Sequence, residues 1–138
     1  MSPSAVLDTN ILVAGLRSRR GASWRILELV RRNEVQMHIT VPLVLEYEDA
    51  LLRHRDEAGW TRRETLAFVG LLGDKAHRHR VHYLWRGHAN DPDDAHVLEA
   101  AVAANVTYLV TFNTKDLTPA EQFGIEVVTP GAFLRTIE

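Results

Sequence analysis

Residues 5–10 read Ala5-Val6-Leu7-Asp8-Thr9-Asn10, a short apolar run that stops at an acidic residue. A run of this length bounded by polar residues is typical of a buried strand. Other strand-like segments cover residues 35–41, 79–84, 108–111 and 125–128. Because these strands alternate with helical segments, the pattern predicts an α/β fold. Its central parallel sheet should have the first strand in the middle and helices on both faces.

Helical patterns fill the stretches between these strands. Pro42 suits the first turn of a helix, where its missing N–H has no partner to lose. Thr61 followed by Glu64 three residues later is the capping-box pattern of a helix start. The expected helices cover residues 22–32, 42–54, 61–75 and 91–105, and two more begin near residues 118 and 129. Strands and helices together predict a three-layer α/β/α sandwich.

The composition is that of an ordinary globular protein. The chain has 138 residues, of which 46% are hydrophobic and 25% charged, and this length fits a single domain over residues 1–138. It contains no cysteine, which excludes disulfides and thiolate metal sites. No signal peptide or membrane-spanning run stands out, so we expect a cytoplasmic protein with no membrane partner.

Acidic residues recur beside the expected strand ends. Asp8 follows the first strand, Asp116 follows the fourth, and Glu46 lies among apolar neighbours on the helix after the second strand. Because sites in open parallel sheets form beyond the carboxyl ends of the strands, we expect these acids to converge. Oxygen ligands without cysteine favour a hard cation such as Mg²⁺ or Mn²⁺. The start of the helix at 91–105 adds a further cluster, Asp91, Asp93 and Asp94.

Each acid also has an ordinary structural explanation. Asp8 could cap a helix or a turn, Glu46 could be a solvated helical side chain, and Asp116 could be a loop residue. Asp91 before Pro92 is a well-formed helix start, which accounts for one or two acids of that cluster. A third adjacent acid indicates a nearby cation, because neighbouring carboxylates repel one another. His77, His79 and His82 are not expected to bind a metal ion, and His96 is expected to be a packing or surface group rather than a base.

Taken together, these residues resemble the PIN-domain family. The resemblance covers nearly the whole chain in order and spacing. Its closest branch is the ribonuclease toxins of bacterial and archaeal toxin–antitoxin pairs, the VapC-like group. The matching segments are Val6-Leu7-Asp8-Thr9-Asn10-Ile11-Leu12, Glu46, Asp91-Pro92-Asp93-Asp94, and Val110-Thr111-Phe112-Asn113-Thr114-Lys115-Asp116-Leu117.

The resemblance implies roles for particular residues. Whether Asp91, Asp93 or Asp94 is the main third acid stays open. So does the number of metal ions, because many relatives have an acid where this chain has Asn113. The residues implied to be catalytic and metal-binding are Asp8, Glu46, Asp94 and Asp116. Those implied to support the site are Asn10, Asp91, Thr111 and Asn113.

The implied activity is hydrolysis of RNA phosphodiester bonds by an endoribonuclease that depends on Mg²⁺ or Mn²⁺. The implied partners are an RNA substrate, a cognate antitoxin protein and a second copy in a homodimer. A groove beside helices 42–54 and 61–75 would suit either protein partner. The net charge of −2 does not itself indicate nucleic-acid binding. We therefore expect a local basic group after the first strand to contact RNA phosphates beside Asp8, namely Arg17, Arg19 and Arg20.

Three other classes of protein share features of this sequence. A phosphatase of the haloacid dehalogenase type needs a second acid two residues after Asp8, where this chain has Asn10. A phospho-accepting receiver domain needs paired acids after the first strand and a central aspartate that the sequence does not offer. A catalytically degenerate PIN fold that serves as an RNA- or protein-binding scaffold remains the open alternative.

Overall fold

Parallel strands form one sheet in the computed structural model, which describes residues 2–81 and 95–138. The order across the sheet is β3-β2-β1-β4-β5, and all neighbouring strands run parallel. The first strand is therefore central, as predicted. Its residues Ala5, Val6 and Leu7 are fully buried. The strands are β1 Ser4–Leu7, β2 Gln36–Ile39, β3 His77–Arg78, β4 Tyr108–Val110 and β5 Glu126–Val128.

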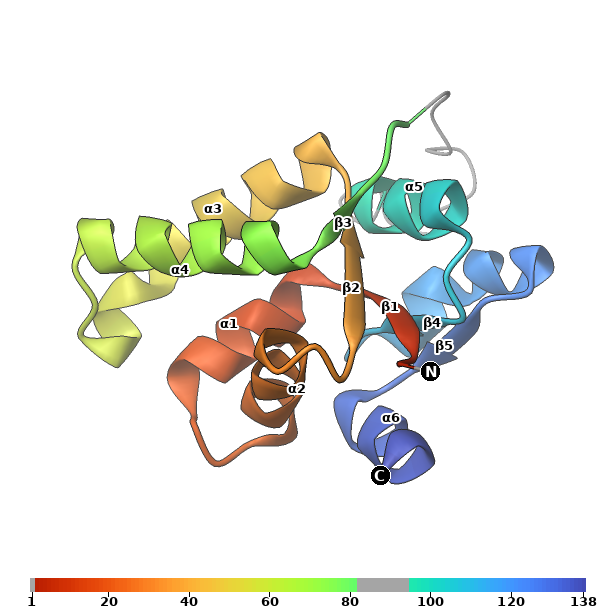
Figure 1. Cartoon of the computed structure of the whole chain (residues 1–138), viewed down its shortest axis with the longest axis horizontal. Coiled ribbons are helices and arrows are strands. Elements are labelled where there is room, and N and C mark those ends of the chain that lie inside the picture. Colours follow the sequence, from red (N-terminus) through yellow and green to blue (C-terminus); the bar gives the residue numbers. More distant parts are fainter. Residues whose placement is uncertain (1, 82–94) are drawn as a thin grey trace.

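Helices cover both faces of this sheet, so the predicted α/β/α sandwich is confirmed. Figure 1 shows α1, α2 and α6 on one side of the sheet and α5 on the other, where α5 contacts β1, β2 and η4. Helices α3 and α4 lie side by side and pack against α1 and α2. The α-helices are α1 Thr9–Arg17, α2 Ala22–Arg31, α3 Val41–His54, α4 Arg62–Lys75, α5 Ala95–Ala104 and α6 Pro130–Ile137. The 3₁₀ helices are η1 Arg55–Ala58 and η4 Thr114–Phe123.

Helix starts follow the local chemistry of the sequence. The Thr61 side chain accepts a hydrogen bond from the backbone N–H of Glu64, and the Glu64 carboxylate accepts one from the backbone N–H of Thr61. This is the predicted capping box. Thr40 caps α3, and Pro42 lies in its first turn.

Helix α1 was not expected from the sequence. Its buried side is formed by Ile11, Leu12 and Leu16, at helical spacing, together with Gly15. A Cβ on Gly15 would lie 2.7 Å from Cδ1 of Leu27, so glycine lets α1 and α2 approach closely. The chain therefore leaves the sheet immediately after Asp8. The residues that follow form a helix on one face of the sheet instead of a loop.

Two other boundaries differ from the prediction. The edge strand β3 covers His77–Arg78, which pair with His38 and Ile39 of β2 in parallel register, and residues 79–81 are not part of it. The rest of the strand expected at 79–84 lies outside the described residues. The 3₁₀ helix η4 begins at Thr114, four residues earlier than the helix expected near 118. The expected start of a helix at 91–94 lies outside the described residues. No helix within the described ranges is both long and apolar enough to cross a membrane.

Candidate functional site

Asp8 lies at the carboxyl end of the central strand, beside the end of its neighbour β4. Leu7 of β1 pairs with Val110 of β4, so the next residues along the two strands, Asp8 and Thr111, are adjacent at the same edge. The Thr111 hydroxyl donates a hydrogen bond of 2.6 Å to Oδ2 of Asp8, and both side chains are buried. Asp8 occupies the N-cap position of α1 without a side-chain capping bond. Capping of α1 therefore does not account for the bond between Asp8 and Thr111.

Burial dominates the electrostatics of Asp8. The side chain is 5% exposed, and this desolvation raises its pKa above the usual value. The Thr111 hydroxyl and the backbone of Thr9 and Asn10 act in the opposite direction, but their effect is smaller. The fold thus holds a carboxylate in a place that disfavours its charge, which indicates a function other than stability.

Glu46 reaches the same edge from α3. Its neighbour Tyr47 is buried, and the Tyr47 hydroxyl donates a hydrogen bond of 2.5 Å to the carbonyl oxygen of Leu7. That bond attaches α3 to the end of β1. Glu46 and Asp8 consequently line one pocket of about 400 Å³. Partial burial raises the pKa of Glu46, and the charge of Asp8 adds to this effect.

His96 on α5 contacts Glu46, a role that sequence reasoning missed. Nδ1–H of His96 donates a hydrogen bond to Oε1 of Glu46, and both side chains are partly buried. This hydrogen bond opposes the effect of burial on the Glu46 pKa. The sequence analysis expected a packing or surface group at His96 and did not predict its contact with Glu46. The only available signal was its position, two residues after Asp94 at the start of a helix.

The donor set of this pocket suits a hard divalent cation. Asp8 and Glu46 supply carboxylate oxygens to the pocket. Asn10 lines the neighbouring groove that also includes Asp8, and its buried Oδ1 has no hydrogen-bond partner among the described residues. Oxygen ligands of this kind are those that Mg²⁺ and Mn²⁺ prefer. However, residues 2–81 and 95–138 contain no group of three or more histidine, aspartate or glutamate side chains that could hold a metal ion. The described part of the site brings together two buried or partly buried carboxylates, Asp8 and Glu46, while the carboxylate of Asp49 at the same pocket is exposed.

The other predicted site residues do not all lie beside Asp8 and Glu46. The backbone N–H of Asn113 donates to the Thr111 hydroxyl at 2.9 Å, so Asn113 lies next to the site. Asp116 lies in the first turn of η4 and is partly buried. Among the described residues, the side-chain partner of Asp8 is Thr111 and that of Glu46 is His96, so neither is Asp116. Asp91 and Asp94 lie outside the described residues, as does Asp93.

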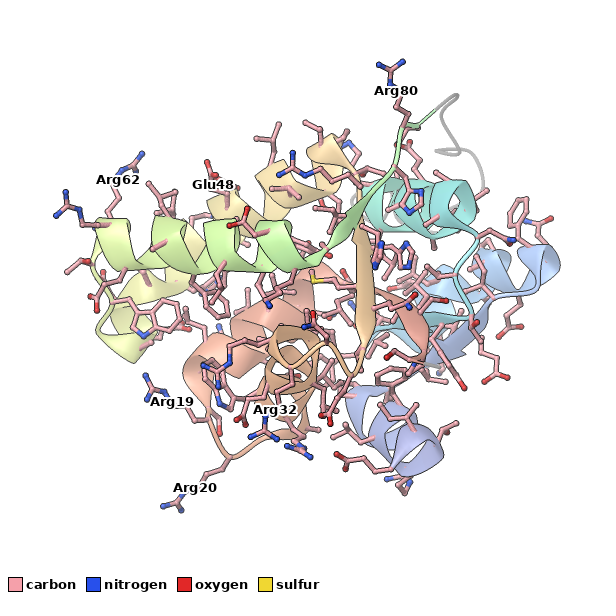
Figure 2. All side chains as sticks on the ribbon, in the orientation of Figure 1. Arg19, Arg20, Arg32, Glu48, Arg62 and Arg80 are labelled. Atoms are coloured by element: carbon pink, nitrogen blue, oxygen red, sulfur yellow. The ribbon has the colours of Figure 1, made fainter. Side chains whose placement is uncertain are left out.

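The three expected RNA-binding arginines are spread along α1 and the loop after it. Arg17 ends α1, about 13 Å along the helix from Asp8. It still lines a groove that includes Asp8. Arg19 lies over the Trp24 ring at 5.5 Å from the ring centre, and Figure 2 shows Arg19 and Arg20 pointing into solvent from the loop between α1 and α2. Helix α1 thus carries this loop away from Asp8.

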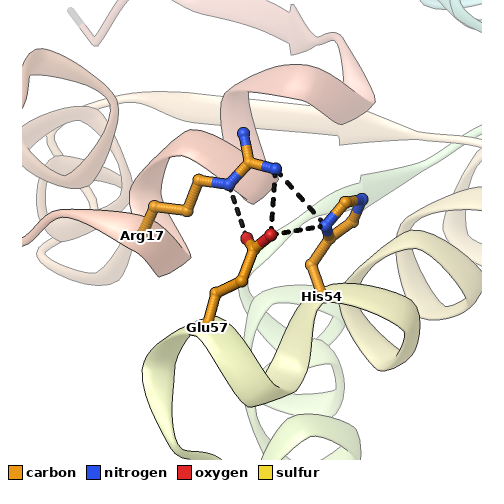
Figure 3. Close-up of polar contacts among 3 residues, drawn as sticks. All are labelled: Arg17, His54 and Glu57. Carbon is orange, nitrogen blue, oxygen red and sulfur yellow. Dashed lines mark hydrogen bonds and ion pairs between the residues drawn. The ribbon is translucent and has the colours of Figure 1, made fainter.

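Arg17 belongs to a small polar network at the edge of the groove (Figure 3). Its Nε donates to Oε2 of Glu57 at 2.5 Å, and Nδ1 of His54 lies 3.2 Å from Oε1 of Glu57. These hydrogen bonds lower the pKa of the Glu57 carboxyl to about 2, with that from Arg17 contributing most. Both members of the ion pair are about half exposed, so Arg17 can exchange this partner for another anion.

Comparison with known proteins gave one family. The family model described as the PIN domain matches residues 4–115, well over half of the chain. The match includes Asp8, Glu46, Thr111 and Asn113, and it ends one residue before Asp116. No curated protein matches the chain.

Proposed function

The chain belongs to the PIN-domain family, and from this premise we propose that it is a metal-dependent endoribonuclease that hydrolyses RNA phosphodiester bonds. PIN domains are in general nucleases. The observation that carries the proposal is the pair of carboxylates, Asp8 and Glu46, that share one pocket at the carboxyl edge of the sheet. Burial raises the pKa of both groups, so the pocket without a cation disfavours their charges.

We propose that Asp8 and Glu46 hold Mg²⁺ or Mn²⁺, with Asp94 and Asp116 completing the ligand set. Asp91 and Asn113 would support these ligands, as would Asn10, whose buried Oδ1 faces no described partner. The bound cation would supply Lewis-acid stabilisation of the phosphate and acidify the attacking water. Thr111 fixes the orientation of Asp8 through its 2.6 Å hydrogen bond. His96 orients Glu46 by occupying Oε1, which leaves the second oxygen for other partners.

RNA would approach along the groove that runs from Asp8 to Arg17. Arg17 lines this groove, while Arg19 and Arg20 extend the positive charge beyond the end of α1. Contacts of this kind bind phosphates and carry no sequence information. We propose that these arginines position the RNA backbone and that the acidic pocket cuts it.

We further propose that the protein is the cytoplasmic toxin of a toxin–antitoxin pair, bound by an antitoxin and paired as a homodimer. Support comes from Val41 and Leu45 on α3, which are 67% and 59% exposed. They line an apolar groove of about 180 Å³ that also includes Gly73 of α4. The family resemblance suggests a partner groove beside these same two helices. Co-purification with the product of a neighbouring gene tests the pairing, and a protein that stays monomeric and harmless on overexpression would contradict it.

Cleavage of a generic RNA tests the enzymatic proposal. The parent should cleave with Mn²⁺ and stop with EDTA, and Asp8→Asn and Glu46→Gln should each lose more than about a hundred-fold, beyond the loss typical of residues that only support a ligand. Asp49→Asn is the matched control, because Asp49 lines the same pocket on α3 but its side chain is 72% exposed. It should cleave within a few-fold of the parent. Cleavage that survives EDTA would contradict a metal-dependent mechanism.

The alternative is a PIN-fold scaffold without catalytic activity. It is favoured by the fact that the described residues gather two carboxylates rather than three or more metal-binding groups. The scaffold reading expects RNA or protein binding that neither metal nor the Asp8→Asn substitution changes. Binding and cleavage measured on the same preparation therefore separate the two functions.

A further inference from the structure

Phe112 is an exposed aromatic side chain held next to the acidic pocket. It is 51% exposed, and it follows Thr111, whose hydroxyl binds Asp8. The backbone N–H of Thr111 donates to the Val128 carbonyl at 2.9 Å, and the backbone N–H of Asn113 donates to the Thr111 hydroxyl. Residues on both sides of Phe112 are thus anchored, so the fold presents this ring to solvent from a fixed backbone.

An isolated exposed apolar residue needs no explanation, so the surroundings of Phe112 decide its meaning. The ring lines a groove of about 440 Å³ together with Asp8, Arg17 and Arg53. Arg17 pairs with Glu57, and Arg53 pairs with Asp49 at 3.4 Å, and all four side chains are exposed enough to exchange partners. One groove therefore combines an aromatic face, two cations and the carboxylate proposed to act on a phosphodiester.

These three features match the parts of a single-stranded nucleic acid. Cations suit the phosphates, and an aromatic face suits a base whose own face is free. In an A-form duplex each base is stacked on both sides, so its face cannot reach a protein ring. A phenyl ring has no donor or acceptor, so it reads no base edge and tolerates any base.

Building on the proposed nuclease function, we propose that Phe112 is a stacking platform for an unpaired base beside the cleaved phosphate. The stacked nucleotide is therefore unpaired, and Phe112 accepts its base with little preference for one base over another. Arg17 and Arg53 hold the flanking phosphates in the same groove.

Two substitutions separate stacking from apolar contact. Phe112→Leu keeps a large apolar side chain without a π-face, and Phe112→Trp keeps and enlarges that face. Leu71→Ala is the control, because Leu71 is also an exposed apolar residue, 43% exposed, but lies on α4 outside this groove. All three are placed in the Asp8→Asn protein, which is not expected to cut the probe.

The probes are a single-stranded RNA oligonucleotide of mixed sequence carrying 2-aminopurine, and the same strand annealed to its complement. Binding is followed by anisotropy, and stacking by quenching of the 2-aminopurine. Phe112→Leu should weaken single-strand binding by about 5- to 150-fold and abolish the quenching. Phe112→Trp and Leu71→Ala should bind like the Asp8→Asn protein. The duplex should bind weakly and without dependence on residue 112.

Single-strand binding unchanged by Phe112→Leu, or equal affinity for strand and duplex, would overturn this inference. The outcome is distinguishable from failure of the nuclease proposal. If the parent cleaves RNA with Mn²⁺, and Phe112→Leu changes neither cleavage when made in the parent nor binding when made in the Asp8→Asn protein, the nuclease proposal stands and the platform is removed. If the parent stacks the probe base through Phe112 but never cleaves RNA, the nuclease proposal is wrong and the stacking platform stands.

Discussion

Replacing Asp8 by asparagine should remove activity without lowering the stability of the metal-free protein. Asparagine keeps the size of the side chain and still accepts a hydrogen bond from the Thr111 hydroxyl. It removes the negative charge of a buried carboxyl group whose pKa burial raises. If the Asp8 carboxylate stabilised the fold, Asp8→Asn would instead lower the stability of the metal-free protein.

The expected size follows from two opposing contributions. Each unit by which burial raises the Asp8 pKa costs the parent about 1.4 kcal/mol of unfolding free energy at neutral pH. Exchanging a charge-assisted hydrogen bond for a neutral one loses about 1 kcal/mol. The free energy of unfolding of Asp8→Asn should therefore equal or exceed that of the parent. In a domain of this size 1 kcal/mol corresponds to about 4 °C in Tm.

The pH dependence has a definite sign. Because the folded pKa of Asp8 lies above the unfolded one, the folded state holds the proton more tightly. The penalty on the parent is absent below the unfolded pKa, near 3.8, and grows as pH rises through the folded pKa. The difference in Tm between Asp8→Asn and the parent should therefore shrink as the solution is acidified.

Thermal melts in EDTA across this pH range measure the effect. Thr111→Val is the matched control, because it removes the hydroxyl donor but leaves the buried carboxylate. It should lower stability by about 1–3 kcal/mol. An Asp8→Asn protein that melts well below the parent at neutral pH, as Thr111→Val should, would refute the reasoning and make Asp8 a structural residue.

Three further predictions concern neighbouring groups. His96→Ala should weaken Mn²⁺ binding by about 10- to 100-fold, measured by calorimetry, because Glu46 loses its orienting partner, and an unchanged affinity would contradict that role. Replacing Arg17, Arg19 and Arg20 together by alanine should weaken RNA binding and flatten its dependence on salt, whereas an unchanged salt slope would place the RNA elsewhere. Burial, followed by repulsion from His77 and His79, lowers the pKa of His38 to about 4, below the unfolded value of 6.5. Stability should therefore fall as pH drops from about 6.5 to 4, and His38→Gln should reduce that loss in melts over the same range.

Local sequence patterns predicted most of the fold. The wholly apolar run before Asp8 predicted the central strand, and Thr61 with Glu64 predicted the start of α4. Helix α1 was missed because the polar residues after Asp8 look like a loop start, although the spacing of Ile11, Leu12 and Leu16 is helical. The two-residue edge strand β3 is defined by pairing with β2, a tertiary contact that residues 77–84 do not reveal by themselves.

The sequence predicted which residues belong to the candidate site, but it predicted only some of the contacts between them. Asp8 beside Thr111 follows from adjacent strand ends and could be predicted once the sheet order was known. The bond between His96 and Glu46 joins residues 50 positions apart, and that between Arg17 and Glu57 joins residues 40 apart. Such contacts depend on how α3 packs against α5 and how α1 packs against η1, which no local pattern encodes.

A crystal structure grown with Mn²⁺, with the ion located by its anomalous scattering, tests the central claim most directly. The account predicts an ion in the pocket formed by Asp8 and Glu46, with carboxylate oxygens of both residues at about 2.1 Å and with Asp94 and Asp116 completing the ligands. An ion that binds elsewhere, or one in this pocket that Asp8 does not contact, would contradict it.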